Sequence, residues 1–266
     1  MRSDTALYSH RGKSLRAQDF LHALSKAGIK KGDVIFVHSD ISVFGKLAMR
    51  DKRGLLSALS ETLMKSVGTE GVVIMPTFSY SFTKREAFDP KSTPSTVGVL
   101  TEYFRKEKGV VRTKHPIFSV AVWGKHKKKF SDVGTDSFGE DSIFGSLRRS
   151  RGKVVFFGAP VHSLTFLHYI EQAHGVPYRC FKTFRGTIVD GTHRYRTSAR
   201  YFVRDLKKDV ETDTSRLEAR LRASAAVREA FVGGSRILAI PAADIFTEGM
   251  RMLDWDIHAF LKRKPQ

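Results

Sequence analysis

The stretch Asp33-Val-Ile-Phe-Val-His38, which continues into Ser39-Asp-Ile-Ser-Val-Phe-Gly45, decides the fold of this chain. A short apolar run between Gly32 and a serine is typical of a buried strand. A second run of this kind, Gly71-Val-Val-Ile-Met-Pro76, follows a predicted helix over 55–67. Buried strands that alternate with helices indicate an α/β fold, in which the strands share one central sheet.

The same alternation continues along the chain. We expect further strands at 119–123, 153–157 and 236–240. We expect further helices at 14–27, 93–109, 163–174, 213–231 and 243–261, the second opened by Pro94 in its first turn. Two β-rich runs, at 182–189 and 193–203, flank Asp190-Gly191, which is a strong hairpin-turn signal.

These elements predict a single compact α/β domain over 1–266. Its mostly parallel central sheet is flanked by helices and carries a β-hairpin excursion near 180–204. The core of the domain is expected within 30–180, and the hairpin and C-terminal helices within 180–266.

The charge of the chain indicates an anionic partner. Among 266 residues, 46 Lys and Arg stand against 27 Asp and Glu, which gives a formal net charge of +19. Such an excess suits a nucleic acid, a membrane surface or a phosphorylated ligand. Hydrophobic residues make up 41% of the chain, with 20 Phe, and this content excludes intrinsic disorder.

The apolar runs and the cysteine content bear on the compartment. The longest apolar runs are of strand length, and the first four residues carry no signal-peptide core. Cys180 is the only cysteine, which excludes an internal disulfide and a Cys-rich metal site. We therefore expect a cytoplasmic protein. As a nucleophile, Cys180 has no base near it in sequence, and single cysteines mostly serve packing.

The loop after the first buried strand is the first candidate site. It leaves the carboxyl end of its strand, where open α/β sheets bind ligands. Ser39, Ser42 and Gly45 offer hydroxyls and accessible backbone N–H groups that suit a pyrophosphate. The alternative is an ordinary loop, since Ser- and Gly-rich loops are common. The loop matches neither a Walker A motif nor a dinucleotide fingerprint.

The second candidate site lies on the helix predicted over 163–174. Thr165, His168 and Glu171 follow at intervals of three and share one helix face. A histidine with a carboxylate one turn away can act as a general base. The alternative is a surface histidine with an incidental glutamate. Metal binding is not predicted, because histidines six residues apart lie about 240° apart around a helix.

The third candidate site is the segment from Arg112 to Ser119. His115 precedes Pro116, which forces an extended backbone there and places these side chains near the entrance to a strand. Arg112 and Lys114 could hold a phosphate. The alternative is a solvated loop.

Six groups of residues, taken in chain order, carry a resemblance to a known family. They are Gly32-Asp-Val34 with Val37-His-Ser39; Val72-Val-Ile-Met-Pro-Thr-Phe78; Phe88-Asp-Pro90 with Thr93-Pro-Ser95 and Gly98; Tyr103-Phe-Arg105 with Gly109-Val-Val-Arg112, His115-Pro116 and Ser119-Val-Ala121; Phe138-Gly-Glu-Asp-Ser142 with Phe144-Gly145; and Thr165-Phe-Leu-His-Tyr-Ile-Glu171 with Val176-Pro-Tyr-Arg179. Together they resemble the aminoglycoside 3-N-acetyltransferase family, strongly over 30–180 and loosely elsewhere.

The resemblance implies an N-acetyltransferase that moves an acetyl group from acetyl-CoA directly to an amine-bearing sugar. It implies His168 as the general base, Glu171 as its orienting partner and Thr165 as a residue lining the site. The residues implied for coenzyme A are His38, Ser39, Ser42, Gly45, Thr77, Arg112, His115 and Ser119. Those implied for the acceptor are Phe78, Tyr178 and Arg179. No metal is implied, and either a monomer or a homodimer is compatible with it.

The chemistry agrees with these roles. An amine in neutral water is mostly ammonium, with a pKa of about 10, and must lose a proton before it attacks a thioester. A neutral imidazole is a base of suitable pKa. The oxyanion that forms needs fixed donors, and either the backbone of the Ser39–Ser42 loop or Thr165 could supply them.

The charge near the predicted hairpin sets the expected acceptor. Segment 177–208 contains nine basic residues and two acidic ones. The basic residues are Arg179, Lys182, Arg185, Arg194, Arg196, Arg200, Arg204, Lys207 and Lys208. Such a rim would repel a polycationic drug, so we expect a nucleotide-linked or polysaccharide-precursor amino sugar. A genuine aminoglycoside 3-N-acetyltransferase that confers antibiotic resistance is the alternative.

Two other classes of protein fit the charge but not the motifs. A nucleic-acid-binding protein on a decayed enzyme fold would explain +19, but no RNA-recognition, KH or zinc pattern is present. A scaffold at a membrane surface would need an amphipathic anchor with interfacial aromatic residues, which the sequence lacks. We therefore expect neither a nucleic acid nor a membrane as partner.

Overall fold

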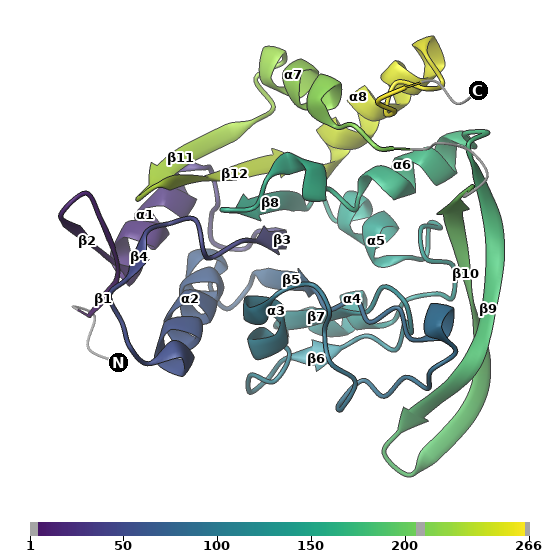
Figure 1. Ribbon diagram of the computed structural model, residues 1–266, viewed down its shortest axis with the longest axis horizontal. Coiled ribbons are helices and arrows are strands. Elements are labelled where there is room, and N and C mark those ends of the chain that lie inside the picture. The colour runs from purple at the N-terminus through teal and green to yellow at the C-terminus, as the bar shows by residue number, and fades with distance from the viewer. Residues whose placement is uncertain (1–4, 206–210, 264–266) are drawn as a thin grey trace.

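A seven-stranded sheet forms the centre of the protein in the computed structural model, which describes residues 5–205 and 211–263 (Figure 1). In spatial order its strands are β11, β12, β8, β3, β5, β7 and β6. Their bounds are Arg228–Val232 (β11), Ser235–Pro241 (β12), Lys153–Phe157 (β8), Val34–Ser39 (β3), Val72–Pro76 (β5), Val120–Gly124 (β7) and Val111–Arg112 (β6). The buried strands predicted from the apolar runs are therefore present.

The direction of the strands differs from the prediction. Only β3 lies parallel to its neighbours, β5 and β8, and the other four pairings are antiparallel. The prediction of a mostly parallel sheet is therefore wrong, and the sheet is mixed. An apolar run shows that a strand is buried but not which way it points. Antiparallel neighbours can be joined by short turns, as β11 and β12 are, without a crossover helix.

Helices cover both faces of this sheet. Their bounds are Ala17–Lys26 (α1), Lys52–Val67 (α2), Val99–Phe104 (α3), Lys127–Ser131 (α4), Ile143–Arg149 (α5), Leu167–His174 (α6), Ser215–Ala223 (α7) and Ala242–Trp255 (α8). Single 3₁₀ turns lie at Phe82–Lys84 (η1) and Val161–Ser163 (η2). Alternation along β3 places Phe36 in the core on one face, while Ile35 and Val37 enter the core on the other.

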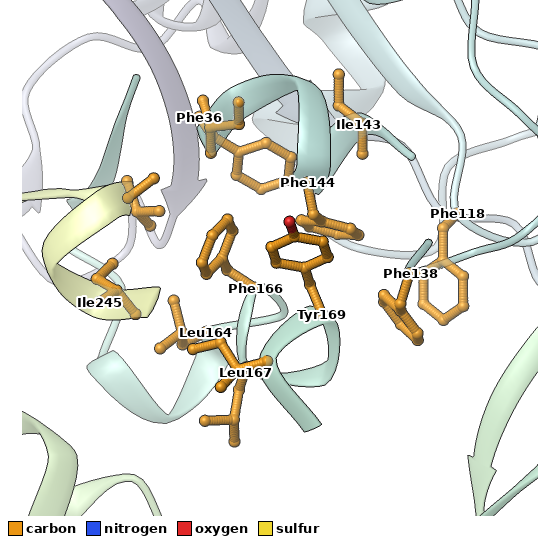
Figure 2. Close-up of a cluster of buried hydrophobic side chains, with 14 of the residues drawn as sticks. Phe36, Phe118, Phe138, Ile143, Phe144, Leu164, Phe166, Leu167, Tyr169 and Ile245 are labelled. Atoms are coloured by element: carbon orange, nitrogen blue, oxygen red, sulfur yellow. The ribbon is translucent and has the colours of Figure 1, made fainter. Parts of the chain in front are cut away.

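The core on the Phe36 face supports the helix that carries His168. Phe144 of α5 and Phe166 and Tyr169 at α6 gather there with Ile245 of α8 (Figure 2). Full burial of one such aromatic side chain contributes on the order of 2–3 kcal/mol. The position of α6 relative to the sheet is thus fixed by packing along its apolar side.

Several segments differ from the sequence-based expectations. The helices expected over 14–27 and 163–174 begin only at Ala17 and Leu167, because a strand occupies 13–16 and a 3₁₀ turn occupies 161–163. A small sheet of β1 (Ala6–His10), β2 (Lys13–Arg16) and β4 (Lys46–Leu47) was not predicted, because its strands are short and largely polar. The helix expected over 93–109 is only α3, because 93–98 form a loop. The helix expected over 213–231 ends with α7, and strand β11 follows.

The hairpin is confirmed and is longer than predicted. β9 (Arg179–Asp190) pairs along its whole length with β10 (His193–Arg204), from Arg204 opposite Arg179 to His193 opposite Asp190. It runs along one edge of the molecule (Figure 1). The last predicted helix ends at Trp255 instead of 261. Because β11 and β12 join the central sheet, that sheet contains strands from both 30–180 and 180–266. A single domain over 1–266 stays a prediction.

None of the helices in the described part of the chain has both the length and the apolar character that crossing a membrane requires.

Candidate active site

His168 and Glu171 meet on one face of α6. The Nδ1 atom of His168 lies 2.6 Å from Oε2 of Glu171, and the Glu171 side chain is completely buried. The His168 side chain keeps 23% of its surface exposed. Because an ionised carboxylate only accepts hydrogen bonds, Nδ1 carries the proton of the neutral ring. The Nε2 atom of His168 is then left with its lone pair.

Arg179, the first residue of β9, completes a buried triad with these two residues. Its Nε atom lies 2.7 Å from the same Glu171 oxygen, and its side chain is 4% exposed. The neighbouring Tyr178 is also buried, and burial together with the charge of Glu171 raises the pKa of its hydroxyl. Arg179 of the Val-Pro-Tyr-Arg motif therefore contacts the buried carboxylate of α6. From the sequence, Tyr178 and Arg179 were expected to contact the acceptor instead.

The charges of the triad keep His168 neutral. Burial and the adjacent Arg179 lower the pKa of His168, while its hydrogen bond to Glu171 acts in the opposite direction. Burial alone would raise the pKa of Glu171, but contacts with His168 and Arg179 hold it below its usual value. The triad thus combines an ionised carboxylate, a guanidinium and a neutral imidazole at pH 7.

Phe138 contacts His168 and connects it to a group of aromatic residues from other segments. The Phe138 ring lies 5.4 Å from the His168 ring, and the Tyr201 ring of β10 lies 5.7 Å from that of Phe138. Tyr80, with φ of +56°, packs against Phe118 with ring centroids 5.5 Å apart. Burial raises the pKa of Tyr80 to about 12, so its hydroxyl remains a neutral donor. Neither Tyr80 nor Tyr201 is predicted from the sequence, because neither side chain stands out from the pattern of its own segment.

The carboxyl end of β3 holds the first group predicted to bind coenzyme A. His38 is 5% exposed and stacks on Phe156 with ring centroids 5.5 Å apart. Burial lowers its pKa to about 3, so the ring is neutral. Its Nε2 atom is buried and makes no hydrogen bond within the described residues. A series of ring contacts through Phe36, Phe144 and Phe138 links His38 to His168.

The rest of this loop is shaped by contacts within the protein. The hydroxyl of Ser42 donates to Oδ1 of Asp40 at 2.6 Å, and its backbone N–H donates to the same atom at 3.0 Å. Gly45, with φ of +157°, approaches β1 so closely that a Cβ atom would lie 2.6 Å from the carbonyl oxygen of Ser9. Gly45 is required by this close approach, and no observation places it beside the other candidate residues.

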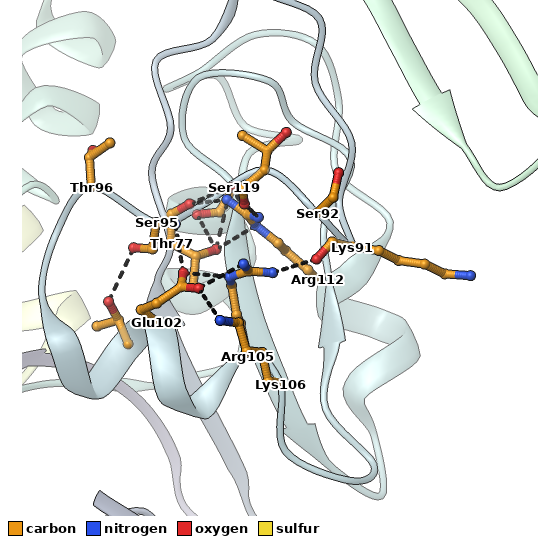
Figure 3. Close-up of polar contacts among 12 residues, drawn as sticks. Thr77, Lys91, Ser92, Ser95, Thr96, Glu102, Arg105, Lys106, Arg112 and Ser119 are labelled. Atoms are coloured by element: carbon orange, nitrogen blue, oxygen red, sulfur yellow. Dashed lines mark hydrogen bonds and ion pairs between the residues drawn. The ribbon is translucent and has the colours of Figure 1, made fainter. Parts of the chain in front are cut away.

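Arg112 is buried at the centre of a polar network (Figure 3). Its Nε donates to Oγ1 of Thr77 and to Oγ of Ser119, both at 3.1 Å, and its Nη2 donates to the Thr77 carbonyl at 2.6 Å. Its Nη1 donates to the carbonyls of Pro90 and Thr93. The guanidinium that was expected to hold a phosphate therefore joins β5, β7 and the 88–95 loop.

His115 is also committed to contacts within the chain. Its Nδ1 accepts from the backbone N–H of Ile117 at 3.3 Å and of Phe118 at 3.0 Å, and its Nε2 lies 3.4 Å from the Ser137 hydroxyl. Because Nδ1 accepts, Nε2 carries the proton. Burial lowers the pKa of His115 to about 4, and the ring is neutral.

The two remaining candidates, Thr165 and Phe78, make hydrogen bonds within the chain. Thr165 is half-buried and donates to the Ser163 carbonyl at 3.4 Å, just before α6. Phe78 is buried, and its backbone carbonyl accepts from the Thr96 hydroxyl. The structure thus brings His168, Glu171 and Arg179 into one cluster. It brings Thr77, Arg112 and Ser119 into a second. Within the described ranges, no three His, Cys, Asp or Glu side chains gather as a metal site would require.

A neutral histidine beside a buried carboxylate, on a mixed α/β scaffold, is the arrangement that a general base requires. Residues 36–254 match the family model described as aminoglycoside 3-N-acetyltransferase, and the chain belongs to this family. This confirms the resemblance and the prediction of an acyltransferase with acetyl-CoA as co-substrate.

Individual relatives agree with the family assignment. The chain is 30% identical over 186 residues to the SPbeta prophage-derived aminoglycoside N(3')-acetyltransferase-like protein YokD of Bacillus subtilis (strain 168), covering 61% of this chain and 66% of YokD. It is 24% identical to aminoglycoside N(3)-acetyltransferase III of Salmonella sp., covering 87% and 89%.

Solved structures share the fold. The structure of aminoglycoside acetyltransferase AAC(3)-Xa superposes with a TM-score of 0.78 at 23% identity, over 94% of this chain and 95% of that one. A structure of AAC-IIIb described as binary with CoASH superposes with a TM-score of 0.75 at 24% identity, over 94% and 98%.

Proposed function

We propose that this protein transfers the acetyl group of acetyl-CoA to an amine of an aminoglycoside, with His168 as the general base. The observation that carries the proposal is the 2.6 Å contact between Nδ1 of His168 and the buried carboxylate of Glu171. This contact orients the ring and leaves Nε2 free to take a proton. Proton transfer by a positioned base of this kind contributes about 10²–10⁴ in rate.

Acetyl-CoA, His168, Glu171 and Arg179 have separate roles in the proposed transfer. Acetyl-CoA supplies an acetyl thioester, whose C–S bond breaks as the C–N bond to the amine forms. The acceptor ammonium gives one proton to water and a second to Nε2 of His168 as the C–N bond forms, and Glu171 stabilises the resulting imidazolium. Arg179 keeps Glu171 ionised, so that the carboxylate does not take the proton itself. The proton on Nε2 is then available to the departing sulfur.

The carboxyl end of β3 is the proposed edge for coenzyme A. The buried Nε2 atom of His38, which has no partner in the described part of the chain, fits a site completed by a ligand. Ser39 supplies a hydroxyl at the same end of β3, whereas the hydroxyl of Ser42 already donates to Asp40. In the proposal Arg112 and His115 do not contact coenzyme A, because their polar atoms already form hydrogen bonds within the chain. They position the loops that contain their partners.

The geometry of the hairpin removes the argument against an aminoglycoside. Residues opposite one another in the register share a face, and the side chain of Tyr201 faces Phe138 with Lys182 as its direct partner. Lys182 is the only lysine or arginine of the two strands on that face, since the six arginines have the other parity. Of these six, Arg179 at the base of the hairpin does reach the site, where it is paired with Glu171. The expectation of a nucleotide-linked acceptor rested on these charges, and the relatives' names do not support it either. Lys207 and Lys208 lie outside the described residues.

The relatives supply the acceptors to test. One solved structure, of AAC-VIa, is described as bound to sisomicin, and others, of AAC(3)-IVa, as complexes with a gentamicin and with apramycin. Free-thiol release from acetyl-CoA should be measured with these three drugs and with a nucleotide-linked amino sugar. We expect turnover with at least one drug and a product heavier by one acetyl group. Turnover with the nucleotide-linked sugar alone would contradict the proposed acceptor.

A further inference from the structure

The outer face of the β9–β10 hairpin is a row of arginines. The register alternates sides, so that the residues on this face are the odd positions of 179–189 and the even positions of 194–204. Six of these twelve residues are arginines and none is acidic. Arg179 is buried under the hairpin's base, whereas Arg185, Arg194, Arg196, Arg200 and Arg204 are exposed.

Most of these arginines have no partner in the part of the protein that the structure describes. Arg200 lies 3.3 Å from Asp136 and covers the ring of Phe181 at 3.4 Å. Arg185, Arg194, Arg196 and Arg204 form no ion pair with any carboxylate in the described ranges. Exposed arginines placed side by side repel one another, so this arrangement costs stability unless an anionic partner binds it.

The chemistry of the face distinguishes between anionic partners. A membrane anchor presents several apolar residues to the lipid, whereas here only Phe181 is exposed, at 45% and with Arg200 over its ring, and Phe202 is buried. Arginine binds phosphate with two parallel N–H donors, and the face carries no lysine. Thr183 and Ser198, which lie between the arginines, add neutral hydroxyl donors of the kind that contact phosphates.

The dimensions of the hairpin suit duplex DNA. Twelve residues per strand, at about 3.4 Å each, give a ribbon of about 40 Å. Arg194 and Arg196 are then about 7 Å apart, and DNA carries one phosphate per 3.4 Å along each strand. The major groove, about 12 Å wide, admits a two-stranded ribbon.

We propose that the arginine face of the β9–β10 hairpin binds the phosphate backbone of duplex DNA, separately from the acetyl-transfer site. This replaces the expectation from the sequence motifs that no nucleic acid is a partner, because the register gathers the arginines on one face. Binding is independent of base sequence, because the face presents cations and hydroxyls. Four unpaired arginines, each in contact with one phosphate, give a salt slope of about −3.6 in log Kobs against log [salt].

The test is fluorescence anisotropy of the full chain with a labelled duplex of mixed sequence, about 20 base pairs long, between about 50 and 200 mM KCl. The variant Arg185→Gln/Arg194→Gln/Arg196→Gln should weaken binding at least tenfold and reduce the salt slope by about 2.7. The matched control Lys46→Gln/Arg50→Gln/Lys52→Gln removes three exposed cations between β4 and the start of α2, and these two elements lie across the molecule from the hairpin (Figure 1). It should keep the Kd within about threefold.

Three outcomes would overturn the proposal: no binding by the unaltered protein at the lowest salt concentration, equal losses in the two triple variants, or an unchanged Kd in the hairpin variant. A loss of binding to phosphatidylserine vesicles with DNA binding intact would assign the face to membranes instead, and would also overturn it. Because acetyl transfer should be equal in all three proteins, failure here is distinguishable from failure of the proposed enzymatic function.

Discussion

Replacement of Arg179 by methionine should shift the pH dependence of acetyl transfer. Arg179 and His168 both contact Oε2 of Glu171, at 2.7 and 2.6 Å, so the charged Nε and the ring Nδ1 lie within about 5.3 Å of each other. At an effective dielectric constant of about 20, two unit charges at this distance repel by about 3 kcal/mol. This repulsion lowers the pKa of His168, in addition to the larger effect of burial.

The sign of the expected shift follows from the role of His168 as a base. The imidazole must be unprotonated to accept the ammonium proton, so activity disappears as pH falls through its pKa. Loss of Arg179 raises that pKa, and the acidic limb of kcat/KM should move to higher pH. Activity at about pH 6.5 should therefore fall much more than activity at about pH 8.5.

The assay is the pH profile of kcat/KM with sisomicin at a fixed, low acetyl-CoA concentration. Arg179→Lys retains the positive charge and should keep the acidic limb within about half a pH unit of the unaltered enzyme. Loss of a buried partner costs about 3–5 kcal/mol of stability, so the folding of each variant is checked by its Tm. A folded Arg179→Met variant with an unchanged acidic limb would refute this account of how His168 is kept neutral.

Three further predictions concern stability, each measured from urea unfolding. The free energy of unfolding should fall by up to about 3 kcal/mol for each of His38 and His115 as pH drops from about 6.5 toward 4. The reason is that these histidines take up protons in the unfolded chain but not where they are buried in the folded protein. A flat profile would contradict their neutrality. Gly45→Ala should lower the free energy of unfolding by about 1–3 kcal/mol through its clash with Ser9, whereas an unchanged midpoint would show that β1 gives way. Arg112→Met should lower it by about 3 kcal/mol or more by leaving buried acceptors unpaired; a higher KM for acetyl-CoA with full stability would instead indicate a phosphate ligand.

The sequence predicted those parts of the fold that depend on local patterns. The apolar runs at Val34–Ser39, Val72–Pro76 and Lys153–Phe157 became central strands, and Asp190-Gly191 became the turn of the hairpin. Strand direction was not predictable in this way, because burial looks the same in parallel and antiparallel pairs. Strand β11 was taken for a helix, since its five residues lie at the sheet's edge, where apolar alternation is weak.

The site was predictable to a similar extent. The spacing of His168 and Glu171 on one helix anticipated their contact, because residues three apart meet on a helix surface. The commitment of Arg112 to Thr77 depends on partners 35 residues away, and no local pattern shows that its donors are occupied. The outward position of the hairpin arginines depends on register, which a count of charges does not contain.

The central claim is that Nε2 of His168 removes the proton from the acceptor amine. The most direct test is the single-turnover rate of acetyl transfer to sisomicin by His168→Gln, beside His162→Gln, which changes an exposed histidine six residues earlier. The account predicts a fall of at least about 100-fold for His168→Gln, coenzyme A binding within a few-fold of the unaltered enzyme, and no change for His162→Gln. Equal single-turnover rates in both variants would show that another group removes the proton.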